Sequence, residues 1–134
     1  MRGLWVGLAL LIASPVMAEP IAYDKAIHAL IGEAGGQEEA ELQAHACALK
    51  NRGTLRGVYG LKADIRNRGV SARKRAVIAW NRALNGLDTV NGATHWLSDY
   101  DLAHSREALI AWRHRAVYSV RVGETTFYRL KKGD

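Results

Sequence analysis

A run of small residues near the middle of the chain most constrains how this sequence can fold. Helical spacing over residues 37–50 groups small side chains on one face, namely Ala40, Ala44, Cys47 and Ala48. Side chains of this size let neighbouring helices approach closely, so we predict a helix here at the centre of the fold. Cys47 is predicted to be a buried small hydrophobe, because a reactive thiol needs an accessible, electropositive setting.

Periodic apolar residues predict two further helices around this central one. The first covers residues 23–33 and ends at Gly35 and Gly36, which suit a helix C-cap. The other covers residues 72–85, with Ser71 as its cap and Gly86 after its last turn. The segment between the central helix and this one contains four glycines and four arginines, so it is predicted to be a loop with short extended pieces.

The C-terminal part of the chain mixes helical and strand patterns. Ser105 is predicted to cap a fourth helix over residues 105–117. Residues 117–130 then alternate in polarity and turn at Gly123, which predicts a short β-hairpin. With 134 residues and no internal repeat, the chain is predicted to form one domain that is mainly α-helical, an α+β fold with a small C-terminal hairpin.

The N-terminus has the pattern of a secretory signal peptide. One arginine precedes an apolar run that ends at Ala13. The small residues Val16 and Ala18 occupy the positions that a signal peptidase recognises. We therefore predict a signal peptide over residues 1–18 and the folded domain over residues 19–134. The protein is predicted to be exported to a periplasm or the extracellular space, with no stable membrane anchor after cleavage. An uncleaved anchor is the less favoured alternative, since the apolar run is short for a bilayer-spanning helix.

The net charge of +6 favours contact with polyanions such as nucleic acid, anionic lipid or an anionic cell-wall polymer. A positive surface can equally serve solubility alone. Export makes envelope polymers the expected partners and counts against nucleic acid. A nucleic-acid binder is therefore the least favoured interpretation. A cytosolic location together with affinity for a nucleic-acid duplex would support it.

Glu33 stands where the first predicted helix meets two glycines. The negative end of the helix dipole and the apolar neighbours of this residue favour a protonated carboxyl group. Such a group can act as a general acid, which glycosidic cleavage needs in order to protonate the leaving oxygen. From position alone, an ordinary exposed glutamate is the competing interpretation. Glu38, Glu39 and Glu41 are predicted to be first-turn charges that complement the dipole of the central helix.

Several polar and aromatic residues are candidates for a sugar-binding cleft. Gln37 comes one turn after Glu33 and can face the same cleft or lie at the surface. Thr94, His95 and Trp96 follow a glycine-bearing loop, and an aromatic face there can stack on a sugar, although a core position is the alternative for the tryptophan. The sequence contains no H-E-x-x-H metal motif, P-loop, nucleophile elbow or dinucleotide fingerprint.

Three ordered segments resemble one known family. "IGEAGGQEEAELQAHACALKNRG" resembles the signature of the cell wall hydrolase family that includes the spore-cortex-lytic enzymes, with an E-A-x-G-E segment, a small-residue helix and a closing N-R. "AWNRALNGLDTVNGATHWLS" resembles the family's A-x-x-x-x-x-G and G-A-x-x-F/W pattern, and "VGETTFYRL" resembles its I-G-x-H-x-F-Y ending. The matching residues of the first segment are Glu33, Ala34, Gly36, Ala44, Ala46, Ala48, Asn51 and Arg52.

The resemblance implies a lysozyme-like domain that acts on the glycan strands of peptidoglycan without a metal or organic cofactor. It implies that Glu33 is the catalytic acid. Cleavage would fall between N-acetylmuramic acid and N-acetylglucosamine and leave an anhydro end, as in lytic transglycosylases. The chain departs from the family twice, because Gln37 replaces the second glutamate of the first motif and Thr125 replaces the histidine of the last motif.

Two alternatives to this reaction stay open. A plain hydrolase would need a second carboxylate, and Asp88, Asp99 and Asp101 lie in or near the loop predicted to form the cleft. A non-catalytic envelope protein that binds glycan or an anionic polymer is the competing function, motivated by the two departures from the family. The residues predicted to contact substrate around the catalytic Glu33 are Gln37, Thr94, His95, Trp96 and Tyr128.

Overall fold

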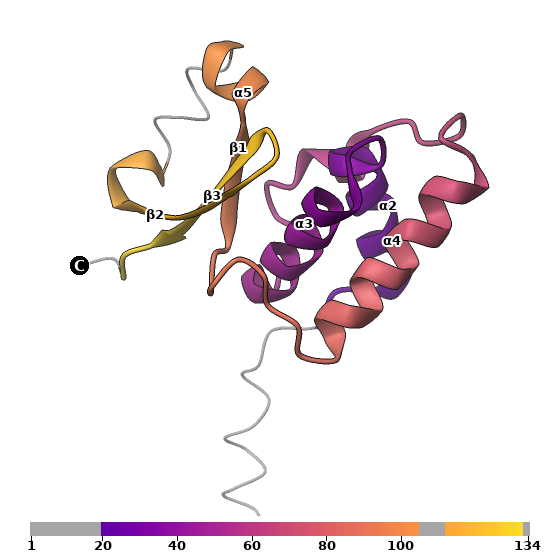
Figure 1. The fold of residues 1–134 in the computed structure, drawn as a ribbon, viewed down its shortest axis with the longest axis horizontal. Helices are drawn as coiled ribbons and strands as arrows, with labels where there is room; N and C mark the ends of the chain where they lie inside the picture. Colours follow the sequence, from indigo (N-terminus) through magenta and orange to yellow (C-terminus); the bar gives the residue numbers. More distant parts are fainter. Residues whose placement is uncertain (1–19, 105–111, 133–134) are drawn as a thin grey trace, which may run out of the picture.

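The computed structural model describes residues 20–104 and 112–132, which form a group of helices beside a small antiparallel sheet (Figure 1). The predicted signal peptide, residues 1–18, lies outside the described residues. No helix in the described ranges is long and apolar enough to cross a membrane. The elements in chain order are α2 (Tyr23–Ala34), α3 (Glu39–Arg52), η2 (Tyr59–Lys62), α4 (Gly69–Leu84), β1 (His95–Ser98), α5 (Asp99–His104), η3 (Arg113–Arg115), β2 (Ala116–Val122) and β3 (Thr125–Leu130).

Helix α3 lies between the other long helices and the sheet (Figure 1). Its residues 41–49 are all buried, so its middle has no face turned to solvent. The predicted central helix is confirmed, although Ala40, which was predicted to be buried, is exposed in the first turn. Cys47 is buried as predicted, and its thiol donates a hydrogen bond to the carbonyl of Leu87 (3.2 Å).

Several element ends differ from the sequence predictions. Gly69 has a φ of 83°, which turns the chain into α4 at this residue, so Ser71 lies inside the helix and does not cap it. Gly53, with a φ of 73°, ends α3. The predicted helix over residues 105–117 is wrong at its C-terminal end, because β2 begins at Ala116, while its residues 105–111 lie outside the described residues.

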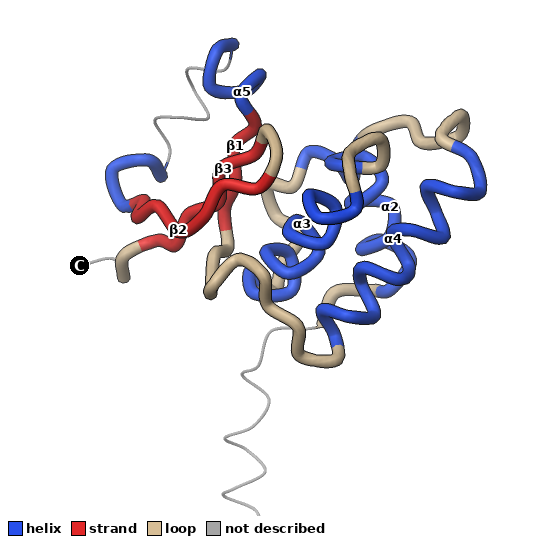
Figure 2. Tube along the Cα trace, in the orientation of Figure 1, coloured by secondary structure: helices blue, strands red, loops and turns tan. Residues whose placement is uncertain are grey.

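The predicted hairpin is confirmed as β2 and β3, and β1 pairs with the other edge of β3 (Figure 2). His95 lies opposite Tyr128 and Trp96 opposite Phe127 in this pairing. The glycine-bearing loop expected before Trp96 therefore ends at Thr94, and His95 and Trp96 belong to a strand that the sequence did not indicate. A four-residue strand is too short to show alternation in the sequence, and it exists because β3 supplies its hydrogen bonds.

The segment between α3 and α4 contains the 3-10 helix η2 where a loop with extended pieces was predicted, and η2 packs against α2 through two glycines. A Cβ atom on Gly32 would lie 2.1 Å from the carbonyl oxygen of Gly60. A Cβ atom on Gly60 would lie 2.6 Å from the Cγ atom of Glu33. Residues with side chains cannot approach this closely. The backbone of η2 therefore lies directly beside the C-terminal end of α2.

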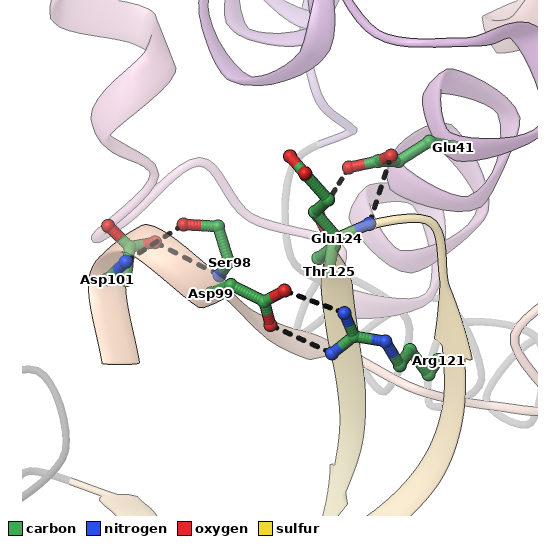
Figure 3. A network of polar contacts seen from close by, with 7 residues as sticks. All are labelled: Glu41, Ser98, Asp99, Asp101, Arg121, Glu124 and Thr125. Carbon is green, nitrogen blue, oxygen red and sulfur yellow. Dashed lines mark hydrogen bonds and ion pairs between the residues drawn. The ribbon is translucent and has the colours of Figure 1, made fainter. Parts of the chain in front are cut away.

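Glu41 ties α3 to the turn between β2 and β3. Its side chain is 4% exposed and accepts hydrogen bonds from the Thr125 hydroxyl (2.8 Å) and the backbone N–H of Glu124 (3.3 Å) (Figure 3). Glu39 and Glu41 lie in the first turn of α3 as predicted, and the hairpin turn additionally covers Glu41. The hydroxyl of Thr125 is used in this contact.

Replacing Glu41 by alanine is expected to lower the free energy of unfolding by about 2 kcal/mol, because two donors lose their acceptor in a buried place. Glu39→Ala is the matched control, since Glu39 lies in the same helical turn and its side chain forms an exposed ion pair with Arg82 (3.3 Å). Its effect should stay below about 0.5 kcal/mol. Urea denaturation followed by circular dichroism compares the two variants. Equal losses of stability would contradict the role assigned to Glu41.

Candidate functional site

Glu33 lies in the last turn of α2, and both of its carboxylate oxygens accept hydrogen bonds. The indole N–H of Trp96 donates to Oε1 (2.8 Å), and the backbone N–H of Gly60 donates to Oε2 (2.5 Å). The donors come from β1 and η2, which are 63 and 27 residues away along the chain. Each oxygen keeps a second lone pair for a proton or a substrate hydroxyl. The carboxyl group is therefore held in one orientation and remains able to exchange a proton.

Two adjoining cavities of about 130 and 280 Å³ open beside Glu33. Arg52, His95 and Trp112 help to line the smaller cavity, and Gln37, His45 and Thr125 help to line the larger one. Because the two cavities share lining residues, we treat them as one cleft, called here the Glu33 cleft. The shared residues are Glu33, Tyr59, Trp96 and Asp101.

Trp96 is held in place from two sides. The guanidinium of Arg52 lies 5.8 Å from the centre of the indole ring. This side chain also donates hydrogen bonds to the carbonyls of Thr94 (3.3 Å) and Arg56 (2.5 Å). The ring of His45 meets the indole edge-on, with ring centres 5.6 Å apart. Burial lowers the pKa of Arg52, and the charge of Glu33 opposes this shift.

His45 is a buried histidine on the wall of the larger cavity. Its Nδ1 atom carries a proton, because it donates a hydrogen bond to the carbonyl of Glu41 (2.8 Å). Burial lowers the pKa of His45, and this hydrogen bond and the charges of Glu33, Glu41 and Asp101 oppose the shift. A neutral imidazole therefore presents an unprotonated Nε2 atom as a hydrogen-bond acceptor.

Four of the six site residues predicted from the sequence line the cleft, namely Glu33, Gln37, His95 and Trp96. Thr94 and Tyr128 are absent from both linings in the described part of the chain. The Thr94 hydroxyl forms a hydrogen bond with His95 Nδ1 (2.9 Å). Tyr128 is buried in β3 opposite His95, with its ring centre 5.5 Å from that of Trp112. These two residues therefore stand behind the wall that His95 and Trp112 form.

Tyr59, Trp112 and His45 are among the cleft residues that the sequence did not indicate. Tyr59 lies in a segment predicted to be loop and Trp112 in a segment predicted to be helix, and neither pattern points to a site. A signal existed for His45, since a polar ring interrupts the run of small residues between Ala44 and Ala48. A titratable side chain at such a place needs a polar partner, which often marks a functional site.

The three aspartates that the sequence leaves as candidates for a second catalytic carboxylate have different surroundings. Asp88 accepts backbone hydrogen bonds within its own turn (3.0 and 2.9 Å). Asp99 is exposed and forms two hydrogen bonds with Arg121 (2.8 and 2.6 Å), which hold the pKa of Asp99 below its usual range (Figure 3). Asp101 lines both cavities beside Glu33. Of these three, Asp101 is the acid that the fold brings to the cleft.

The pKa of His95 is lowered to about 4, first by burial of its ring and then by the charges of Arg52 and Arg115. The ordinary value for histidine is 6.5. Between these values the unfolded chain binds more protons at this residue than the folded chain does. The stabilising contribution of neutral His95 is therefore complete above about pH 6.5 and is lost as the pH falls toward about 4.

His95→Gln is expected to weaken the loss of stability on acidification between about pH 6.5 and about pH 4. Burial of His45 acts in the same direction, so part of the slope should remain in the variant. Melting temperatures of both proteins at closely spaced pH values measure the two slopes. Identical slopes, or an NMR titration that shows His95 protonating near its ordinary value, would contradict the prediction.

A comparison with solved structures finds a match over most of the chain. The catalytic domain of the germination-specific lytic transglycosylase SleB from Bacillus anthracis aligns with a TM-score of 0.57 and 20% sequence identity, over 84% of this chain and 100% of that chain. This chain shares the fold of that domain. The predicted fold class, a mainly α-helical, lysozyme-like α+β domain with a small C-terminal hairpin, is confirmed.

No family model matches the chain, and no curated protein matches it. Within residues 20–104 and 112–132, no group of three or more histidine, cysteine or acidic side chains is arranged to hold a metal ion.

Proposed function

We propose that this protein is an exported enzyme that cleaves peptidoglycan glycan strands between N-acetylmuramic acid and N-acetylglucosamine, as a lytic transglycosylase. The observation that carries the proposal is the carboxyl group of Glu33, held by Trp96 and Gly60 where two cavities adjoin. The fold shared with a lytic transglycosylase domain supports it. The predicted signal peptide and the positive net charge agree with action on an anionic polymer outside the cytoplasm.

In the proposed reaction Glu33 acts twice. As an acid it gives its proton to the glycosidic oxygen, and the electron pair of the breaking bond leaves with that oxygen. The 6-hydroxyl oxygen of the muramic acid then attacks the anomeric carbon of the same sugar, and its proton passes to the Glu33 carboxylate. This closes the anhydro ring and restores the enzyme without consuming water. The two N–H donors keep the carboxyl group in one orientation through both steps.

The two parts of the Glu33 cleft suit one sugar on each side of the bond that breaks. The indole of Trp96 borders both parts, and Trp112 and His95 add aromatic surface to the smaller one, where they can cover the apolar faces of a sugar. Arg52 contributes a cation to the same part, which suits carboxylates of the peptide stems. In the larger part the amide of Gln37 can donate to and accept from an acetamido group.

Mass spectrometry of the products released from purified sacculi tests this function. The expected products are muropeptides that end in 1,6-anhydro-N-acetylmuramic acid. Products with reducing ends and no anhydro form would replace the transglycosylase reaction by hydrolysis. Wild-type protein that binds sacculi and releases nothing would favour the competing function, a non-catalytic protein that binds envelope glycan.

A further inference from the structure

Asp101 brings a carboxylate into the same cleft as Glu33. It lies in the first turn of α5 and lines both cavities, whereas Glu33 comes from the end of α2. Both side chains are partly buried. The charges of Glu33 and Asp101 act together on the buried ring of His45, where each opposes the effect of burial on the pKa of His45. Two acids from distant segments therefore share one site.

A capping box with Ser98 sets the orientation of Asp101. The backbone N–H of Ser98 donates to Asp101 Oδ2 (3.2 Å), and the backbone N–H of Asp101 donates to the Ser98 hydroxyl oxygen (3.0 Å) (Figure 3). The neighbouring Asp99 is paired with Arg121. No ion pair to Asp101 occurs among the residues that the structure describes. Its negative charge is therefore held in the cleft without a neutralising partner from those residues.

We propose that Asp101 is a second catalytic carboxylate, which stabilises the positive charge that develops on the sugar as Glu33 breaks the glycosidic bond. This inference rests on the proposed function. When the bond breaks, its electron pair leaves with the oxygen that takes the Glu33 proton, and the anomeric carbon and ring oxygen become positive. A fixed carboxylate beside that ring stabilises this state more than it stabilises the neutral substrate.

Asp101 takes no proton and forms no bond in this scheme. The 6-hydroxyl oxygen still attacks the anomeric carbon, and its proton still passes to Glu33. Stabilisation of a transient charge affects the rate of the bound complex more than it affects binding. The competing explanation is that Asp101 only caps α5, and this explanation predicts a loss of stability without a specific loss of rate.

Asp101→Asn separates these two roles, because the asparagine side-chain oxygen can still accept the N–H of Ser98 while the charge is removed. We expect the release of muropeptides at saturating sacculi to fall about 10²-fold, with the melting temperature and the half-saturating sacculus concentration close to wild type. Asp99→Asn is the matched control, because it removes the same charge from the same helical turn at an exposed residue. Its release rate should equal that of the wild type.

A wild-type release rate in Asp101→Asn would overturn the inference, since Asp101 would then be only a cap. Equal losses of rate in Asp101→Asn and Asp99→Asn would overturn it as well, because they would reflect a general effect on α5. If Glu33→Gln were inactive in either case, the proposed function would stand without the inference. Failure of the wild-type protein to release any muropeptide would instead remove the proposed function itself.

Discussion

Glu33→Gln is expected to release muropeptides from purified sacculi about 10³-fold more slowly than the wild type. Glutamine has the size of glutamate, but it has no proton to give to the leaving oxygen and cannot take one from the 6-hydroxyl. Its side-chain oxygen can keep the hydrogen bond from the indole of Trp96, but its NH2 group cannot accept the hydrogen bond from the N–H of Gly60, so a melting curve must first show that the variant is folded. Release is measured by chromatography of the soluble products, and binding is measured by co-sedimentation with sacculi, which should persist.

The matched control for this substitution is Glu39→Gln. Glu39 is an exposed acid on α3 whose contact is an ion pair with Arg82, so its removal changes the net charge by the same amount without touching the cleft. Its release rate should match that of the wild type. A Glu33→Gln protein that is folded and lyses sacculi at the wild-type rate would exclude Glu33 as the acid and contradict the proposed mechanism.

Gly60→Ala is expected to lower the free energy of unfolding by about 3 kcal/mol and to impair lysis as well. Its Cβ atom would lie 2.4 Å from the carbonyl oxygen of Ala29 and 2.6 Å from the Cγ atom of Glu33. Backbone must move to relieve these contacts, and the N–H of Gly60, which binds Glu33 Oε2, moves with it. Urea denaturation and muropeptide release, measured on the same preparation, report the two effects.

Gly32 in α2 and Gly36 just after this helix provide comparisons for Gly60→Ala. Gly32→Ala should be as destabilising as Gly60→Ala, because its Cβ atom would lie 2.1 Å from the carbonyl oxygen of Gly60. A Cβ atom on Gly36 would meet nothing within 4 Å, so Gly36→Ala should change stability by less than about 1 kcal/mol. If all three variants were equally stable, the close packing of η2 on α2 would be wrong.

The predictable parts of the fold are those whose pattern is local. Helix α2 and the position of Glu33 at its end follow from apolar spacing and the glycines after it. The central α3 follows from a run of small residues, and the β2–β3 hairpin follows from alternation around Gly123. β1 was missed because four residues carry too little pattern and its hydrogen bonds come from β3.

The candidate site was only partly predictable because its contacts join distant segments. Glu33 was identifiable from its place at the end of a helix and from the resemblance of its surroundings to a family signature. Its hydrogen-bond donors were not identifiable, since Trp96 and Gly60 meet it only after β1 and η2 have packed beside α2. Asp101 was one of three open candidates until the fold placed Asp99 against Arg121 and Asp101 in the cleft.

By itself the sequence predicted the mainly helical fold class and the central small-residue helix, because these depend on periodicity and on backbone preferences, which act over a few residues. It also placed Glu33 at a helix end, and the family resemblance made this residue the candidate acid. Only the tertiary structure decided which groups surround that acid. It made Glu41 a buried link between α3 and the sheet, and it brought His45 and Asp101 to the wall of the Glu33 cleft. Such contacts depend on packing between segments far apart in the chain, so a local sequence pattern does not predict them.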